Sequence, residues 1–117
     1  MTEIDGIYHE DLLFDFYGDL LTENQKRIFR AVEFEDFSVS EVARDENISR
    51  QSVYDMIKRC KKILESYEER LGLCARFEKK RRLGDEIGRL ATRYKDEKDS
   101  TLIDRIIELS ETLAQTD

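Results

Sequence analysis

Apolar residues recur three or four positions apart along most of the chain, and no proline interrupts the pattern. This spacing collects them on one face of an α-helix, whereas a half-buried strand alternates apolar and polar residues. Charged residues make up 40% of the chain, which amphipathic helices accommodate on their solvent faces. We therefore predict an all-α fold. A length of 117 residues suits one compact domain with an added helical arm.

Start and stop signals divide the first third of the chain into two helices. Residues 1–8 have no periodic pattern, so we expect a loose terminus there. Residues 11–21 carry a strongly apolar helical face and predict the first helix. Thr22 and Gln25 have the spacing of a capping box, so a second helix should begin there and end near residues 35–36.

Only a few residues connect the next two helices, which is typical of a helix-turn-helix. Ser38 and Glu41 form another capping box and predict a third helix over residues 39–46. Asn47 tolerates left-handed geometry and Ser49 is a favoured N-cap, so a tight turn leads into a fourth helix. Its inner face should consist of Val53, Ile57, Cys60 and Leu64.

The outer face of the fourth helix is polar and basic. Residues 49–62 contain five bases and one acid, a local charge of +4 in a chain whose net charge is −7. A helix-turn-helix inserts the N-terminus of its second helix into the major groove, where arginine favours guanine and glutamine favours adenine. We expect Lys61 along the phosphates, and the candidate DNA-binding residues are Arg50, Gln51, Ser52, Tyr54, Lys58, Arg59 and Lys62.

Two positions on this outer face, one candidate residue and one acid, leave alternatives open. Tyr54 either stacks on a base or sugar, or packs against the second helix. Asp55 repels phosphate, so it either selects against neighbouring sequences or indicates that this face binds protein.

The C-terminal part repeats the amphipathic pattern. Gly72 weakens it and predicts a break, and a charged connection over residues 95–100 separates two further helices. These helices either fold back as a hairpin or pair with a second chain. We expect residues 1–66 to form the N-terminal helices with the helix-turn-helix core, and residues 67–117 to form a C-terminal helical extension, either within the same compact unit or as a dimerisation arm.

Sites for chemistry or membrane insertion are not indicated. Cys60 and Cys74 lie within helical patterns without a nearby histidine, so we expect buried free thiols and no metal, cofactor or small-molecule substrate. His9 is the only histidine, and no nucleophile pair, carboxylate pair or phosphate-binding loop is present, so the chain is not predicted to be an enzyme. The acidic N-terminus lacks a signal peptide, which favours the cytoplasm.

Two groups of motifs resemble a known family. The stretch from Leu21 through residues 37–43 to residues 48–53 is similar to region 4 of bacterial sigma factors. Residues 13–17, Asp-Phe-Tyr included, and the run Arg-Gln-Ser-Val-Tyr-Asp at 50–55 resemble the YlxM family of Gram-positive bacteria. That resemblance implies a helix-turn-helix domain of the sigma factor region 4 or winged-helix-like type, with three to four helices and C-terminal amphipathic helices.

The resemblance also implies a function. Proteins of the YlxM family are described as DNA-binding regulators encoded beside the GTPase of the signal recognition particle. The first hypothesis is therefore a DNA-binding transcription regulator that takes part in that pathway. The alternative is a factor that binds protein or RNA components of the particle without sequence-specific DNA binding.

Self-association is a further expectation. The apolar stripes of the first helix and of the C-terminal helices are larger than one small core readily covers. We therefore expect a homodimer.

Overall fold

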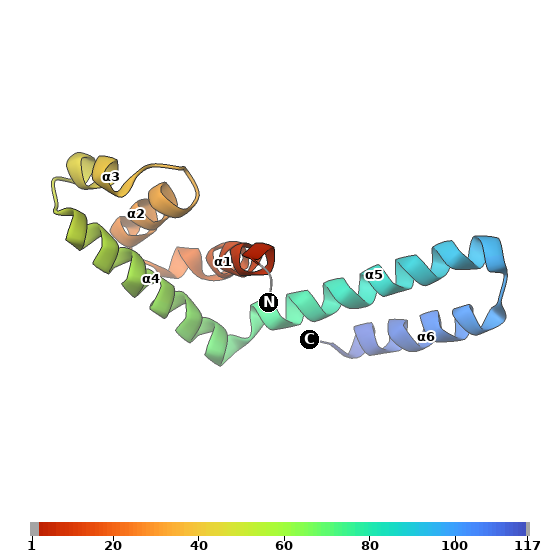
Figure 1. Cartoon of the computed structure of the whole chain (residues 1–117). Helices are drawn as coiled ribbons and strands as arrows, with labels where there is room; N and C mark the ends of the chain where they lie inside the picture. The colour runs from red at the N-terminus through yellow and green to blue at the C-terminus, as the bar shows by residue number, and fades with distance from the viewer. Residues whose placement is uncertain (1–2, 117) are drawn as a thin grey trace. The chain divides into compact units, whose positions relative to one another are not determined.

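The computed structural model describes residues 3–116, with side chains from Tyr8 onward. Its helices, in chain order, are α1 (Glu3–Tyr17), the 3-10 turn η1 (Gly18–Leu20), α2 (Glu23–Glu33), α3 (Val39–Glu46), α4 (Arg50–Leu71), α5 (Leu73–Glu97) and α6 (Ser100–Gln115) (Figure 1). No strand occurs within the described part, and the all-α helix-turn-helix prediction is confirmed. The chain forms two compact units that divide after Gly72, whereas the boundary expected after residue 66 falls inside α4.

The N-terminus differs from the expectation. α1 already begins at Glu3, so the predicted loose terminus is wrong for residues 3–8, while residues 1 and 2 lie outside the described part. The helix expected over residues 11–21 ends at Tyr17, and the chain continues as the tighter η1 from Gly18. A Cβ atom at Gly18 would lie 3.1 Å from the ring of Phe14, so glycine permits this close approach.

Both predicted capping boxes are present. Thr22 Oγ1 accepts from the Gln25 N–H at 3.1 Å, and Gln25 Oε1 accepts from the Thr22 N–H at 3.0 Å. Ser38 and Glu41 make the same exchange at the start of α3. These bonds satisfy backbone donors that a helix start leaves unpaired, and α3 spans the predicted residues 39–46.

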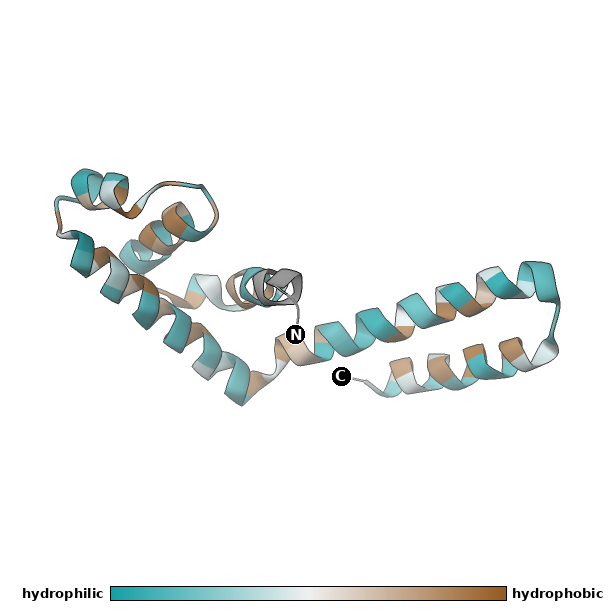
Figure 2. Cartoon of the chain, viewed as in Figure 1, coloured by the Kyte–Doolittle hydropathy of each residue, from teal (hydrophilic) through white to brown (hydrophobic). Residues whose placement is uncertain are grey.

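The core of the first unit lies on the inner face of α4, which packs against α1, α2 and α3. The predicted inner residues are all buried: Val53, Ile57, Cys60 and Leu64. On the facing helices, Phe14 stacks on Phe29 with ring centroids 5.6 Å apart. Hydropathy along each helix changes with the helical repeat, as Figure 2 shows. Burial of this apolar stripe is the main stabilisation of the unit.

The second unit is a hairpin of α5 and α6, which run side by side in opposite directions (Figure 1). The break predicted at Gly72 is confirmed, because this residue caps α4 with a left-handed φ of 64°. Lys98 also has a positive φ of 53° in the connection. Asp99 then caps α6, its Oδ1 accepting from the Thr101 N–H at 2.9 Å. Of the two arrangements left open by the sequence, the structure has the hairpin.

None of the helices described between residues 3 and 116 combines the length and the apolar character required to cross a bilayer.

Candidate nucleic-acid interface

The turn between α3 and α4 is a Schellman motif. Asn47 adopts left-handed angles (φ 57°, ψ 47°), its N–H donates to the Arg44 carbonyl, and the Ile48 N–H donates to the Ala43 carbonyl at 3.0 Å. Ser49 follows at once as the N-cap of α4, accepting from the Ser52 N–H at 3.0 Å. The hydrogen bonds of Asn47, Ile48 and Ser49 restrain the direction in which α4 leaves α3.

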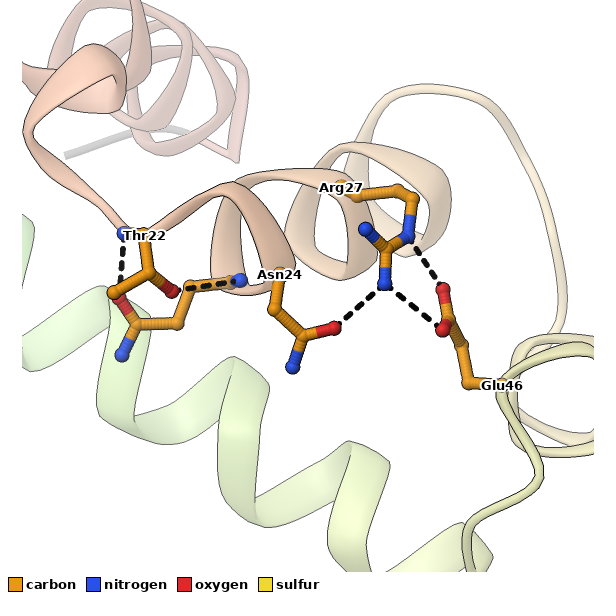
Figure 3. A network of polar contacts seen from close by, with 5 residues as sticks. Thr22, Asn24, Arg27 and Glu46 are labelled. Atoms are coloured by element: carbon orange, nitrogen blue, oxygen red, sulfur yellow. Dashed lines mark hydrogen bonds and ion pairs between the residues drawn. The ribbon is translucent and has the colours of Figure 1, made fainter.

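An ion pair between α2 and α3 adds a second constraint. Arg27 Nε lies 2.6 Å from Glu46 Oε1, and Arg27 Nη2 lies 2.9 Å from Glu46 Oε2 (Figure 3). Asn24 Oδ1 accepts from the same Nη2 at 2.6 Å. Hydrogen bonding to Arg27 lowers the pKa of Glu46, and the pKa of Arg27 is raised in return. This forked geometry ties α2 to the last residue of α3.

The sequence contains no local signal for this ion pair. Arg27 and Glu46 are 19 residues apart, and each one alone reads as an ordinary charge on a solvated helix face. Only the packing of α3 against α2 brings them together.

The outer face of α4 is open to solvent along its first three turns. A helix turns about 100° per residue, so Gln51, Asp55, Lys58 and Lys62 lie opposite the buried Val53. The stretch from residue 50 to residue 62 is about 18 Å long at 1.5 Å per residue. Every candidate DNA-binding residue is exposed: Arg50, Gln51, Ser52, Tyr54, Lys58, Arg59 and Lys62.

The side chain of Tyr54 is 58% exposed. Of the two roles left open for this residue, packing against α2 buries less than half of its surface. The phenol remains accessible for stacking on a ligand.

Two candidate polar groups already have partners within α4. Gln51 Nε2 donates to Asp55 Oδ1 at 2.9 Å, so reading an adenine with this amide requires exchange of that bond. The Ser52 hydroxyl accepts from Ser49 Oγ at 2.8 Å and is part of the cap. Asp55 thus holds the Gln51 side chain in a defined orientation while placing a negative charge in the middle of the face.

Lys61 does not belong to this face, contrary to the expectation that it lies along phosphates. Its Nζ lies 3.3 Å from Glu10 Oε1 and 3.4 Å from Glu33 Oε1, so it joins α4 to α1 and α2. Burial raises the pKa of Glu10, helped by the neighbouring Glu33 and opposed by Lys61. Burial alone lowers the pKa of Lys61, but the two carboxylates outweigh it and the net pKa is raised. Lys61 is therefore a structural cation.

The remaining candidates for chemistry are buried in the fold or make surface contacts. Cys60 and Cys74 are both free and buried, and burial raises the pKa of the Cys60 thiol. His9 Nε2 lies 2.8 Å from Glu65 Oε1. Across residues 3–116, histidine, cysteine and carboxylate side chains nowhere gather in a group of three that could hold a metal ion.

Comparison with known proteins gives a consistent picture. Residues 6–106 match the UPF0122 family, described as "Putative helix-turn-helix protein, YlxM / p13 like". A UPF0122 protein from Symbiobacterium thermophilum is 47% identical over 76 residues, covering 65% of this chain and 71% of that protein. The UPF0122 protein YlxM of Bacillus subtilis is 40% identical over 96 residues, covering 82% of this chain and 87% of its own length.

Proposed function

The chain belongs to the UPF0122 family of YlxM- and p13-like proteins, and from this premise we propose that it is a non-enzymatic regulator that binds double-stranded DNA with α4 in the major groove. The observation that carries the proposal is the exposed outer face of α4, where cations gather on a chain of net charge −7. Such a distribution favours approach of a polyanion to one face of the protein. Its place of action is the cytoplasm, where bacterial DNA lies.

The roles within the face follow from position along the helix. Arg50 and Gln51, in the first turn, are nearest to base edges and supply the bidentate groups that distinguish guanine and adenine. Tyr54 offers an apolar ring to a sugar or a thymine methyl group. Lys58, Arg59 and Lys62 lie about two to three turns further along the helix and contact phosphates.

The electrostatics predict moderate affinity for one domain. The three phosphate contacts of Lys58, Arg59 and Lys62 correspond to a slope of about −3 for the logarithm of the binding constant against the logarithm of the salt concentration. Lys61 adds nothing to this slope because its charge is already compensated by Glu10 and Glu33. Two copies on one duplex would double the number of contacts.

Asp55 favours a second candidate, in which the same face binds the RNA or a protein of the signal recognition particle. A carboxylate in the centre of the face disfavours close approach to a regular array of phosphates. Irregular RNA or a protein surface can leave room for it. Retention of the chain on particle components, with no retention on mixed DNA at low salt, would favour this candidate over the first.

The test of the proposal is selection of a preferred duplex from random DNA, followed by titration in fluorescence anisotropy. Replacing Arg50 by alanine is expected to weaken binding to the selected duplex about tenfold or more. Arg70→Ala is the matched control, since Arg70 is exposed in the last turn of the same helix. Equal affinity of the Arg50→Ala variant and the unaltered protein for the selected duplex would contradict the proposal.

A further inference from the structure

The hairpin of α5 and α6 carries an apolar row that neither helix covers. Ile103 and Ile107 lie one turn apart on α6, and their exposed fractions are 37% and 51%. They flank the row that faces α5, which contains the buried Leu102 and Leu109. Large aliphatic side chains exposed beside a packed seam are typical of an interface.

Two helices are also too few to enclose this seam. Several apolar residues on the facing sides of the hairpin are only half-buried: Leu83, Ile87, Leu90, Tyr94, Ile106 and Leu113. Helical cores of this kind are completed when four helices surround the seam. The hairpin therefore supplies two of the four helices that would bury its apolar seam.

A smooth strip lies beside the seam on α5. Gly84 and Gly88 are one turn apart, and a Cβ atom at either position would meet nothing within 4 Å. Ala91, one turn further, is exposed as well. Small side chains let another helix approach closely, so this strip accommodates bulky residues from a neighbour.

The isoleucine row and the smooth strip lie on the same face of the hairpin. Each lies about 100° from its seam in the same rotational sense, since Gly84 follows Leu83 as Ile103 follows Leu102. In two antiparallel helices, equal rotation from the seam leads to the same side. On this face the isoleucine row of α6 forms a ridge, and the smooth strip of α5 forms a groove.

The charges of the two helices are complementary. Residues 73–97 contain eight bases and five acids, while residues 100–115 contain one base and three acids. α5 is therefore net positive and α6 net negative. A second hairpin that places its α6 over the first α5 brings opposite charges together at both contacts.

We propose that the occupant of this face is the same face of a second copy of the chain, so that two hairpins form a four-helix bundle. The ridge of each copy lies against the α5 strip of the other, as a two-fold axis requires. The pairing does not depend on what α4 binds. The resulting dimer contains two α4 helices, so its affinity for a DNA site with two half-sites is multiplied.

The test is sedimentation velocity of the full chain over a range of concentrations. The unaltered protein is expected to be a dimer at micromolar concentrations. Ile107→Glu should raise the dissociation constant about 100-fold or more, because the buried charge enters the interface twice. Leu20→Glu is the matched control, since Leu20 is 54% exposed in the other unit, and it should leave the dimer unchanged.

A second variant separates loss of the interface from loss of the fold. Gly88→Gln fills the open strip with a polar side chain while improving helix propensity. It should weaken the dimer about tenfold or more and leave the helix content by circular dichroism unchanged or higher. A monomeric unaltered protein, a dimer insensitive to both hairpin variants, or a dimer broken by Leu20→Glu would overturn the proposal. Arg50→Ala should weaken binding to the selected duplex without affecting sedimentation, so the two proposals fail separately.

Discussion

Arg27 of α2 and Glu46, the last residue of α3, form a forked ion pair with N–O distances of 2.6 and 2.9 Å. The pair lies at the end of α3 from which the turn into α4 departs. Apolar packing sets how deeply α3 lies on the core, and the fork adds a directional contact that limits its rotation. The orientation of α4 is thus determined by the Schellman turn on one side and by Arg27 on the other.

Replacing Arg27 by methionine should weaken DNA binding more than it destabilises the fold. The exposed pair contributes little to stability, but a small change in the angle of α3 displaces the contacts of α4, so we expect a loss of up to about fivefold in affinity. Arg93→Met is the matched control, because Arg93 makes a similar fork with Glu97 on α5. Equal effects of both variants on affinity, measured by anisotropy, would rule out the positioning role.

The contribution of Glu46 to stability should disappear in acid. Because the pKa of Glu46 is lowered in the folded protein, the pair stabilises the fold above the ordinary value of 4.5 and loses this effect as the pH falls further. Glu46→Gln should therefore unfold at a lower temperature than the unaltered protein at neutral pH. The difference should vanish in scans taken progressively below pH 4.5. A difference that persists there would show that the charge of Glu46 is not its cause.

Asn47 should be replaceable by glycine but not by alanine. Its φ of 57° lies in the left-handed region, where a Cβ atom without a compensating polar group costs about 1 kcal/mol. Urea denaturation of Asn47→Ala should show this loss in the free energy of unfolding, whereas Asn47→Gly should be close to neutral. Identical stability of the two variants would contradict the role of Asn47 in the turn.

Neutralising Asp55 should strengthen binding to DNA of any sequence. Asp55→Asn removes the one negative charge among the cations of residues 50–62 and still offers an oxygen to Gln51. We expect a gain of about threefold in affinity for mixed DNA at low salt, which fades as salt is added. Asp104→Asn, an exposed change on α6, serves as the control. No gain in affinity would favour the candidate in which this face binds a partner other than DNA.

The local features of the fold could be predicted because each is encoded within one turn of helix. The capping residues Thr22 and Ser38, the left-handed Asn47 and the inner row of α4 depend on spacings of three or four residues. The same reasoning missed the start of α1, because residues 3–8 have no apolar periodicity of their own.

The contacts between distant residues could not be predicted in this way. Lys58 and Lys61 look equivalent in the sequence, but Lys61 meets Glu10 and Glu33 only after α1 and α2 have packed on α4. The fork of Arg27 and Glu46 is likewise a product of packing. The sequence correctly predicted a basic, exposed face on α4. It could not show which cations pair with carboxylates of other helices, because those pairs form only when the helices pack together.

Comparison of Lys58→Ala with Lys61→Ala measures the central proposal most directly. Both variants remove one lysine from α4, and the salt dependence of duplex binding counts the cations that contact phosphates. We expect Lys58→Ala to reduce the magnitude of the slope by about 1 and Lys61→Ala to leave the slope unchanged. Equal slopes for Lys58→Ala and the unaltered protein would contradict binding of DNA by the outer face of α4.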